Sequence, residues 1–172
     1  ATGKRFICIE PSKKNIVGLK GLVKALPSTN RYEIVEVAIS DSDDEIVPFL
    51  EPLDSVTAGH LPMMQPTTNE AFESKSSVYG VNTARLSTVL RTLNVDESFC
   101  LIMDAEGAEG AVICKDDESF AHCSTIIIEL ADSSFGTIAE QTAKLAEIGF
   151  KISDEYYNVK VFQKRRKVNG QM

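Results

Sequence analysis

Three carboxylates separated by small residues follow an apolar run near the middle of the chain. The run is Phe99–Met103, and Asp104, Glu106 and Glu109 come after it with alanine and glycine between them. A continuously apolar run that stops at a glycine-containing turn is typical of a short buried strand. In an open α/β sheet, the carboxyl end of such a strand opens onto the ligand crevice. The pattern therefore places Asp104 at the rim of a crevice, with the two glutamates on the turn and first helical residues beyond it.

Asp104 and Glu106 are close enough in sequence to affect each other's ionisation. Two carboxylates about 5 Å apart repel by roughly 3 kcal/mol at an effective dielectric constant of about 20, so a closed site would need a cation or a proton there. A raised pKa would suit a general base that removes a hydroxyl proton, whereas a sulfonium, a substrate amine or a metal would supply the cation. Two structural alternatives stay open. Asp104 could cap the following helix, and Glu109 could be a helix N-terminal residue stabilised by the helix dipole.

Composition and charge limit the classes of function. The chain has 172 residues, of which 43% are hydrophobic, enough for one domain that buries about 70% of its unfolded surface. Its formal net charge of −7 argues against nucleic acids and anionic membranes, which need a basic footprint. No apolar stretch approaches the roughly 18 residues that cross a bilayer, and no signal peptide precedes the first strand, so a cytoplasmic location is expected. The four cysteines lack metal-ligand spacing, and no metal site is predicted.

Hydrophobic periodicity predicts alternating strands and helices. The expected strands cover residues 6–9, 32–39, 46–50, 78–81, 99–103, 125–130, 150–153 and 159–162, and the expected helices cover 16–26, 86–93, 108–114 and 137–148. Ser12 is expected to cap the first helix, and Asn82 or Thr83 the second. The strand at 46–50 is expected to form a hairpin with the strand before it. The alternation favours a mostly parallel sheet covered on both faces, with the last two strands antiparallel at one edge.

A single domain is expected over residues 1–163. Within it, residues 51–77 lack a clear period and are interpreted as a long loop or lid. Loops of this length are usually functional or mobile, so Met63 and Met64 could cover a bound ligand, and disorder without a role is the alternative. Residues 164–172 are interpreted as a basic C-terminal tail that is solvated rather than bound to nucleic acid.

Four segments resemble the FkbM-type branch of the S-adenosylmethionine-dependent methyltransferases, over residues 5 to about 163. They are residues 6–11, 37–41, 81–90 and 101–109. The last is the most specific, because the order acid, small residue, Glu, Gly, Ala, Glu after an apolar strand is distinctive for that family. The resemblance implies an α/β, Rossmann-like methyltransferase fold.

The resemblance also implies where the cofactor would lie. Glu10, at the end of a strand, would accept hydrogen bonds from both ribose hydroxyls of S-adenosylmethionine, although a solvated strand end is the alternative for this residue. Ala38, Ile39 and Ser40 lie where the family packs the adenine ring. Asp104 would lie near the methionyl part and the sulfonium.

Catalytic roles follow from the same resemblance and from the expected repulsion between the acids. Glu106 is the candidate general base or substrate-positioning group, and Asp104 is the acid on the cofactor side. Glu129, at the end of the next strand, matches an acid of the family pattern. For this residue a substrate contact and a structural ion pair are both open.

One part of the family pattern is missing. The family fold starts with a central strand and a glycine-rich turn, roughly Asp-x-Gly-x-Asn-x-Gly, whereas this chain goes from Ala1-Thr-Gly3 directly into the second strand. A truncated chain and a divergent one would both explain this. The first strand would lie beside the strand that ends at Asp104, and each buried backbone group left unpaired costs about 1–3 kcal/mol. A rearranged sheet, a second copy or partner chain, or part of the loop after Glu51 would have to fill that position.

The expected function is S-adenosylmethionine-dependent methyl transfer to a hydroxyl group of a small metabolite or sugar. A non-catalytic methyltransferase-like interaction module, or a fragment without the complete cofactor site, is the main alternative. A dinucleotide oxidoreductase with Glu10 on the ribose is a third interpretation, but it needs the same missing glycine-rich turn.

Overall fold

Strands and helices alternate in the first 35 residues and again after residue 84, as the periodicity predicts, whereas the described strands follow one another in between. The computed structural model describes residues 3–52, 76–105 and 107–165. Its elements are β1 (Arg5–Ile9), α1 (Lys13–Ala25), β2 (Arg31–Val35), β3 (Ala38–Ile39), β4 (Ile46–Pro52), β5 (Ser76–Ala84), α3 (Leu86–Thr92), β6 (Phe99–Met103), α4 (Glu109–Lys115), the 3₁₀ turn η2 (Asp117–Phe120), β7 (Cys123–Glu129), α5 (Ile138–Glu147), β8 (Phe150–Tyr156) and β9 (Val159–Lys164). The expected mixed α/β class is confirmed. The proposed lid lies mostly outside the described residues, and Lys164, expected in the tail, ends β9.

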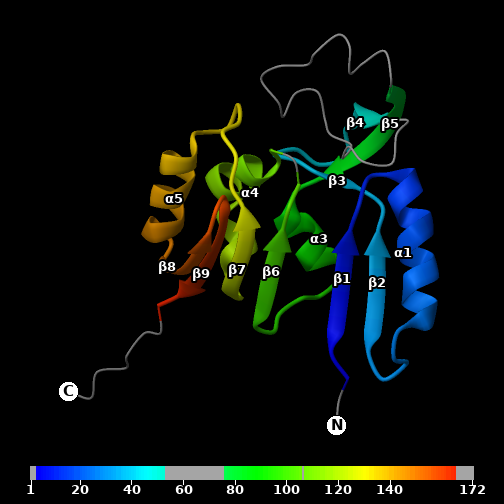
Figure 1. Cartoon of the computed structure of the whole chain (residues 1–172), viewed down its shortest axis with the longest axis horizontal. Helices are drawn as coiled ribbons and strands as arrows, with labels where there is room; N and C mark the ends of the chain where they lie inside the picture. Colours follow the sequence, from blue (N-terminus) through cyan, green and yellow to red (C-terminus); the bar gives the residue numbers. More distant parts are fainter. Residues whose placement is uncertain (1–2, 53–75, 106, 166–172) are drawn as a thin grey trace.

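In the described residues, the strands form three sheets rather than one. Their orders are β1-β2, β3-β5-β4 and β6-β7-β9-β8. β1 is parallel to β2 and β6 is parallel to β7, whereas β9 is antiparallel to both β7 and β8. The antiparallel C-terminal edge is therefore confirmed. The single, mostly parallel sheet is wrong for this part of the chain, because no described strand pairs with the outer edge of β1 or of β6 (Figure 1).

The first helix begins as its sequence predicts. Ser12 is the N-cap of α1, and its Oγ accepts a hydrogen bond from the N–H of Asn15 at 3.0 Å. The helix ends at Ala25, before Pro27, which cannot continue it. The strand–helix–strand unit β1-α1-β2 is thus closed at both ends by local sequence signals.

The segment from 32 to 84 folds differently from its sequence pattern. The expected strand over 32–39 is split, because its last part forms β3 and pairs with β5 instead of continuing beside β1. β4 pairs antiparallel with β5 along its whole length, so it is not the hairpin partner of the preceding strand. Asn82 and Thr83 lie inside β5 and do not cap a helix. Long-range strand pairing overrides the local preference of these two residues for a helix cap.

A residue distant in sequence caps α3. Arg85 occupies the N-cap position but makes no side-chain cap hydrogen bond. Asp116, which is 0% exposed, accepts the Ser87 N–H at 2.8 Å and lies 3.2 Å from Nη2 of Arg85. A carboxylate at a helix N-terminus satisfies an unpaired donor and interacts favourably with the helix dipole. Asp116 therefore couples α3 to the end of α4.

The main core lies on one face of the β6-β7-β9-β8 sheet. Its buried residues include Leu86, Val112, Ile113, Phe120, Ile126, Ile128, Leu145, Phe150 and Phe162. In Figure 1, α3 and α4 lie behind β6 and β7 on this side. No helix in the described ranges is long and apolar enough to cross a membrane.

The other face of this sheet is uncovered by any described helix (Figure 1). Ile102, Ile127 and Val161 are paired across β6, β7 and β9, so they form one row on this face. Ile102 is 74% exposed. An apolar side chain on an unpaired edge strand is a site at which other chains can associate.

We expect Asp116→Asn to lower the free energy of unfolding by about 1.5–3 kcal/mol, because the Ser87 N–H and the Arg85 guanidinium would lose a charged acceptor. The neighbouring Asp117→Asn is the matched control, since Asp117 is half exposed and forms a surface ion pair with Lys144 at 2.9 Å. Its loss should cost at most about 1 kcal/mol. Urea denaturation of both variants measures the difference, and equal losses would contradict the capping role of Asp116.

We expect Ile102→Lys to reduce self-association, because a lysine on an edge strand opposes pairing with another chain. Sedimentation velocity over a concentration series measures the effect. Val17→Lys is the control, because Val17 is 73% exposed on α1 and away from this edge. If the wild-type chain stays monomeric at every concentration, the uncovered face does not promote association.

Candidate functional site

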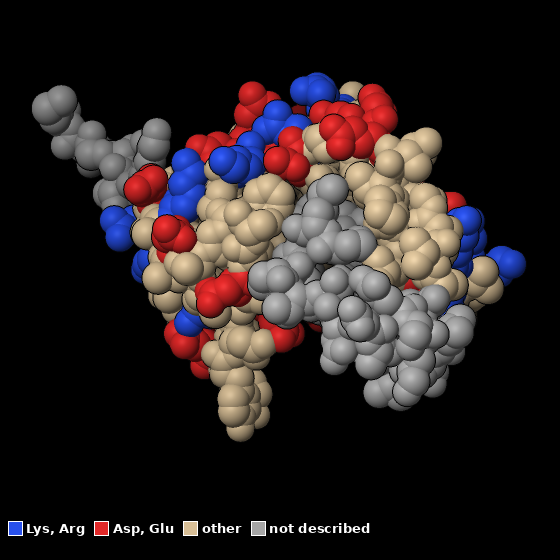
Figure 2. All heavy atoms as spheres, turned by 90° about the horizontal axis from the view of Figure 1, so that it is seen from above, with Lys and Arg blue, Asp and Glu red and all other residues tan. Residues whose placement is uncertain are grey.

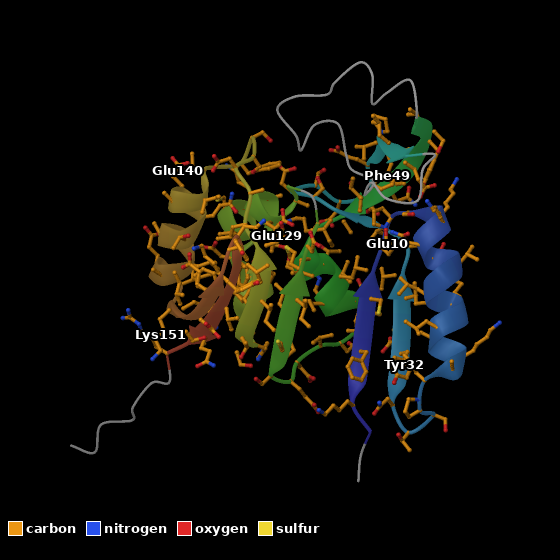
Figure 3. The ribbon with its side chains drawn as sticks, viewed as in Figure 1. Glu10, Tyr32, Phe49, Glu129, Glu140 and Lys151 are labelled. Carbon is orange, nitrogen blue, oxygen red and sulfur yellow. The ribbon has the colours of Figure 1, made fainter. Side chains whose placement is uncertain are left out.

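The predicted site residues lie at the edge where β1, β2, β6 and β7 end. All four strands point to this edge in Figure 1, and Figure 2 looks down on it. Glu10 directly follows β1, Asp104 directly follows β6, and Glu129 is the last residue of β7. Glu10 and Glu129 are labelled in Figure 3. The fold therefore brings together, at one end of the strands, acids that lie far apart in sequence.

Glu10 has one carboxylate oxygen bound by the protein. Its N–H donates to the carbonyl of Val35 at 3.0 Å, which extends the pairing of β1 with β2. Its Oε1 accepts the N–H of Ser12 at 2.8 Å. No described residue donates to Oε2. A ligand hydroxyl at this position would therefore bind Oε2 alone or share Oε1 with Ser12, which modifies the expected contact with both oxygens.

A polar network next to Glu10 was not predicted from the sequence. The hydroxyl of the buried Ser12 hydrogen-bonds the carboxylate of Glu51. The N–H of Lys13 donates to the Tyr79 hydroxyl at 3.0 Å, and its ammonium lies 4.4 Å from the centre of the Tyr79 ring. Burial raises the pKa of Tyr79, and the charge of Glu51 adds to this effect. β4 extends to Pro52 through its pairing with β5, so the expected start of the loop at residue 51 is wrong.

Ala38, Ile39 and Ser40 form a largely buried wall beside this network. Ala38 is 2% exposed and Ser40 is 1% exposed. The N–H of Ser40 donates to the carbonyl of Ala84 at 3.1 Å, so pairing with β5 fixes the backbone of this segment. Ile39 is only partly buried, so it is the residue of this wall that a flat aromatic ligand could contact.

The core connects three parts of the site. Ile9 precedes Glu10, Ile39 lies in the buried wall, and Ala105 follows Asp104. All three side chains pack against the same hydrophobic cluster, which contains Met103 and Leu86. The end of β1, β3 and the acidic turn are therefore positioned by one core.

The acidic turn is organised around Glu109. This residue begins α4 as expected, but it is 1% exposed. Its carboxylate accepts the N–H of Ala105, and also the N–H of Gly107 at 2.7 Å. Gly107 has φ 101°, a conformation that favours glycine. Glu109 therefore holds the backbone on both sides of residue 106, which is more than the helix-dipole role expected of it.

Of the other two acids of the turn, the structure describes only Asp104. Asp104 is exposed. The interpretation of Asp104 as a helix cap is wrong, because α4 has no side-chain hydrogen bond at its N-cap. Glu106 lies outside the described residues, and its role stays a prediction.

Burial raises the pKa of Glu109, since a buried carboxylate loses its hydration. The hydrogen bonds from backbone N–H groups oppose this shift, and the negative charge of Asp104 adds to it. A repulsion was expected between Asp104 and Glu106. In the structure, Asp104 instead repels the charged form of Glu109.

Glu129 is bound to the hairpin between β8 and β9. Nδ2 of Asn158 donates to its Oε1, and the N–H of Leu130 donates to the carbonyl of Asn158 at 3.1 Å. Among the described residues, no Lys or Arg forms an ion pair with Glu129. The structure thus gives this acid a hydrogen-bonded position at the strand end, not the structural ion pair.

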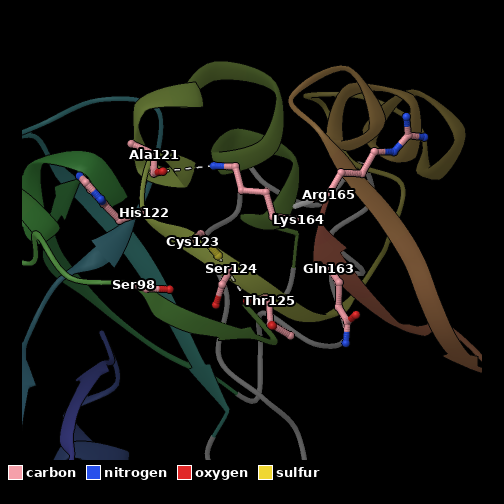
Figure 4. A pocket seen from close by; sticks show the side chains of 9 residues that line it. All are labelled: Ser98, Ala121, His122, Cys123, Ser124, Thr125, Gln163, Lys164 and Arg165. Carbon is pink, nitrogen blue, oxygen red and sulfur yellow. Dashed lines mark hydrogen bonds between the residues drawn. The ribbon is translucent and has the colours of Figure 1, made fainter. Parts of the chain in front are cut away.

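A cavity of about 770 Å³ opens at the opposite edge (Figure 4). It lies at the start of β7 and the end of β9, and Ser124, Thr125 and Gln163 line it. The ammonium of Lys164 donates to the carbonyls of Phe120 and Ala121 at 2.6 and 3.1 Å, so carbonyl oxygens already satisfy it. Because none of the described residues that line this cavity is an acid, the edge at which β1, β2, β6 and β7 end is the better candidate site.

The chemistry of this edge is that of carboxylates near an apolar wall. Such groups accept hydrogen bonds from ligand hydroxyls, favour a fixed cation and can receive a proton. Within residues 3–52, 76–105 and 107–165, no three His, Cys, Asp or Glu side chains cluster as a metal site requires.

The raised pKa of Glu109 has a measurable consequence for stability. The folded state holds this proton more tightly than the unfolded chain, so the free energy of unfolding should fall as pH rises from about 4.3 through the folded pKa. Glu109→Gln cannot titrate. We therefore expect the stability of the wild type minus that of Glu109→Gln to decrease over this range in denaturant melts. A constant or increasing difference for Glu109→Gln would contradict the shift.

Comparison with known proteins identifies the family. The family model of the methyltransferase FkbM domain matches residues 1–152, which include Glu10, the buried wall and the acidic turn. The comparisons with curated proteins and with solved structures gave no match. The family match confirms the resemblance that the sequence motifs carry. Because the match takes in most of the chain, this protein belongs to the methyltransferase FkbM domain family.

Proposed function

We propose that this chain uses S-adenosylmethionine to methylate a hydroxyl group of a small metabolite or sugar. The observation that carries the proposal is the meeting of Glu10, the wall of Ala38 to Ser40, and Asp104 at one edge of the fold. The orders β2-β1 and β6-β7-β9-β8 support a Rossmann-like methyltransferase arrangement, since both parallel pairs end at this edge. Ligands of open α/β sheets bind at such an edge.

The residues of the edge fit two parts of the cofactor. Oε2 of Glu10 can accept a ribose hydroxyl, because no described residue donates to it. Ile39, which is only partly buried, offers apolar surface to the adenine ring, whereas Ala38 is 2% exposed and offers almost none. The exposed carboxylate of Asp104 favours a positive charge nearby. S-adenosylmethionine, when bound, supplies a methyl group on a positively charged sulfur. The described residues contain no glycine-rich turn for its methionine end.

The acceptor hydroxyl must lose its proton as it is methylated. Glu106 is the proposed base, on sequence grounds alone. Glu109 supports that role as a positioning residue, since its hydrogen bonds to Ala105 and Gly107 fix the backbone on both sides of residue 106. A carboxylate near a second carboxylate has a raised proton affinity, which a general base at neutral pH requires.

A second candidate function is a non-catalytic interaction module. The outer edges of β1 and β6 pair with no described strand, and the adjacent sheet face exposes Ile102. A partner chain or a second copy that adds a strand between them would complete the sheet. This candidate requires no cofactor.

We expect calorimetric titration to show micromolar binding of S-adenosylmethionine that Glu10→Gln weakens at least tenfold. A hydrogen bond to a charged acceptor contributes about 1.5–3 kcal/mol, and glutamine keeps one acceptor oxygen for the Ser12 N–H. Glu36→Gln is the control, because Glu36 forms only a surface ion pair with Lys20 at 2.5 Å. A folded sample that releases no heat at millimolar cofactor would contradict the methyltransferase proposal and favour the interaction module.

A further inference from the structure

The tip of the β8-β9 hairpin carries two tyrosines that do not belong to the core. Tyr156 is 74% exposed and Tyr157 is 82% exposed. Their rings pack edge to face on each other, with centroids 4.6 Å apart. An adjacent pair of exposed aromatic rings offers a rigid, amphipathic surface for a ligand.

The backbone at this tip favours a residue other than tyrosine. Tyr157 has φ 54°, a left-handed conformation that is unfavourable for a bulky side chain and usual for glycine in tight hairpins. Strained positions of this kind cluster at sites that bind ligands. The Tyr157 ring is therefore better explained by a contact outside the fold than by the turn itself.

Hydrogen bonds fix the hairpin tip to the candidate site. Asn158 binds both the Glu129 side chain and the Leu130 N–H, so the loop cannot move independently of the end of β7. Val159, the next residue, pairs directly with Glu129.

Strand register places the tyrosines in line with the acids. Tyr156 pairs with Val159, and Val159 pairs with Glu129, so the three share one face of the sheet. On the other side of β7, the last residue of β6, Met103, pairs with Ile128. Continuing this register by one residue puts Asp104 beside Glu129. Neighbouring strands are about 4.8 Å apart, so the row from Asp104 to Tyr156 spans about 14 Å. A six-membered ring with its substituents fits within that length.

The chemistry of this row suits a polyhydroxylated ring. Carboxylates at one end accept hydrogen bonds from hydroxyls, and aromatic faces at the other end pack against C–H groups. The acids disfavour phosphorylated or acidic ligands by charge repulsion. Two tyrosine side chains offer roughly 300–500 Å², well short of the ~800 Å² per partner of a stable protein interface.

We propose that Tyr156 and Tyr157 bind the acceptor of the methyl group, and that this acceptor is a neutral pyranoside. The inference rests on the proposed methyl transfer at the same edge. The ring lies over Val159 and Glu129, with its apolar face on the tyrosines and a hydroxyl toward Asp104.

Saturation-transfer NMR of the full chain with methyl glycosides of glucose, galactose, mannose and rhamnose tests the proposal without cofactor. We expect the ring C–H protons of at least one glycoside to receive saturation, and we expect Tyr156→Ala and Tyr157→Gly each to weaken its binding at least fivefold. Asn94→Gly is the matched control. Asn94 also has a left-handed backbone, with φ 53°, but it lies before β6, away from the site, and this variant should bind as the wild type does.

The melting temperature separates a binding role from a structural one. Tyr157→Gly should melt within about 2 °C of the wild type, because relief of the left-handed strain offsets the greater freedom of glycine in the unfolded chain. Unchanged glycoside affinity in both tyrosine variants would overturn the proposal. Binding of glucosamine without binding of any neutral glycoside would also overturn it.

Parallel calorimetry with S-adenosylmethionine distinguishes failure of this inference from failure of the proposed function. If the wild type binds the cofactor but none of the glycosides, the acceptor assignment is wrong and the methyltransferase proposal stands. If tyrosine-dependent glycoside binding occurs without cofactor binding, the sugar site stands and methyl transfer by this chain does not.

Discussion

Among the described residues, no backbone hydrogen bond crosses the outer edge of β1 or of β6, and the arrangement of this part of the chain follows from that constraint. The Lys4 carbonyl and the Glu10 N–H both bond to β2, so the alternation of parallel pairing turns the polar groups of Ile7 and Ile9 the other way. Likewise, the Phe99 N–H points toward β7. The backbone N–H and C=O groups of Cys100 and Ile102 therefore point away from β7. The β1-β2 pair and the β6-β7-β9-β8 sheet are therefore joined to each other by side chains, through the common core and through the 2.7 Å bond from Arg5 to the Leu93 carbonyl.

Elements with strong local signals could be predicted from the sequence. β6 and β7 are short apolar runs, and α5 has a complete capping box between Thr137 and Glu140. The errors fall where distant residues decide. β5 takes in Asn82 and Thr83 because it pairs with β4, and α3 is capped by Asp116 from 29 residues away. No pattern within a short window contains this information.

Some site residues are likewise positioned by the local sequence, and others by packing of distant segments. Glu10 and Asp104 directly follow β1 and β6, and the apolar runs before them were sufficient to predict this position in the fold. The burial of Glu109 was not predictable, because it depends on the loop that packs over α4. A Cβ on Gly110, next to Glu109, would lie 2.3 Å from Ser133 Oγ and 3.1 Å from Cβ of Phe135. Glu51 entered the site for a similar reason, through the pairing of β4 with β5.

The side-chain contact between the β1-β2 pair and the β6-β7-β9-β8 sheet has a mechanical consequence. Side-chain packing resists a change in separation less than a continuous hydrogen-bonded ladder does, and packed units joined this way deform by small rigid-body shifts. Glu10 follows β1 and Asp104 follows β6, so the two residues lie on opposite sides of this contact. The separation of Glu10 from Asp104 is therefore the distance that changes most easily, and a ligand that bound both residues would oppose that change.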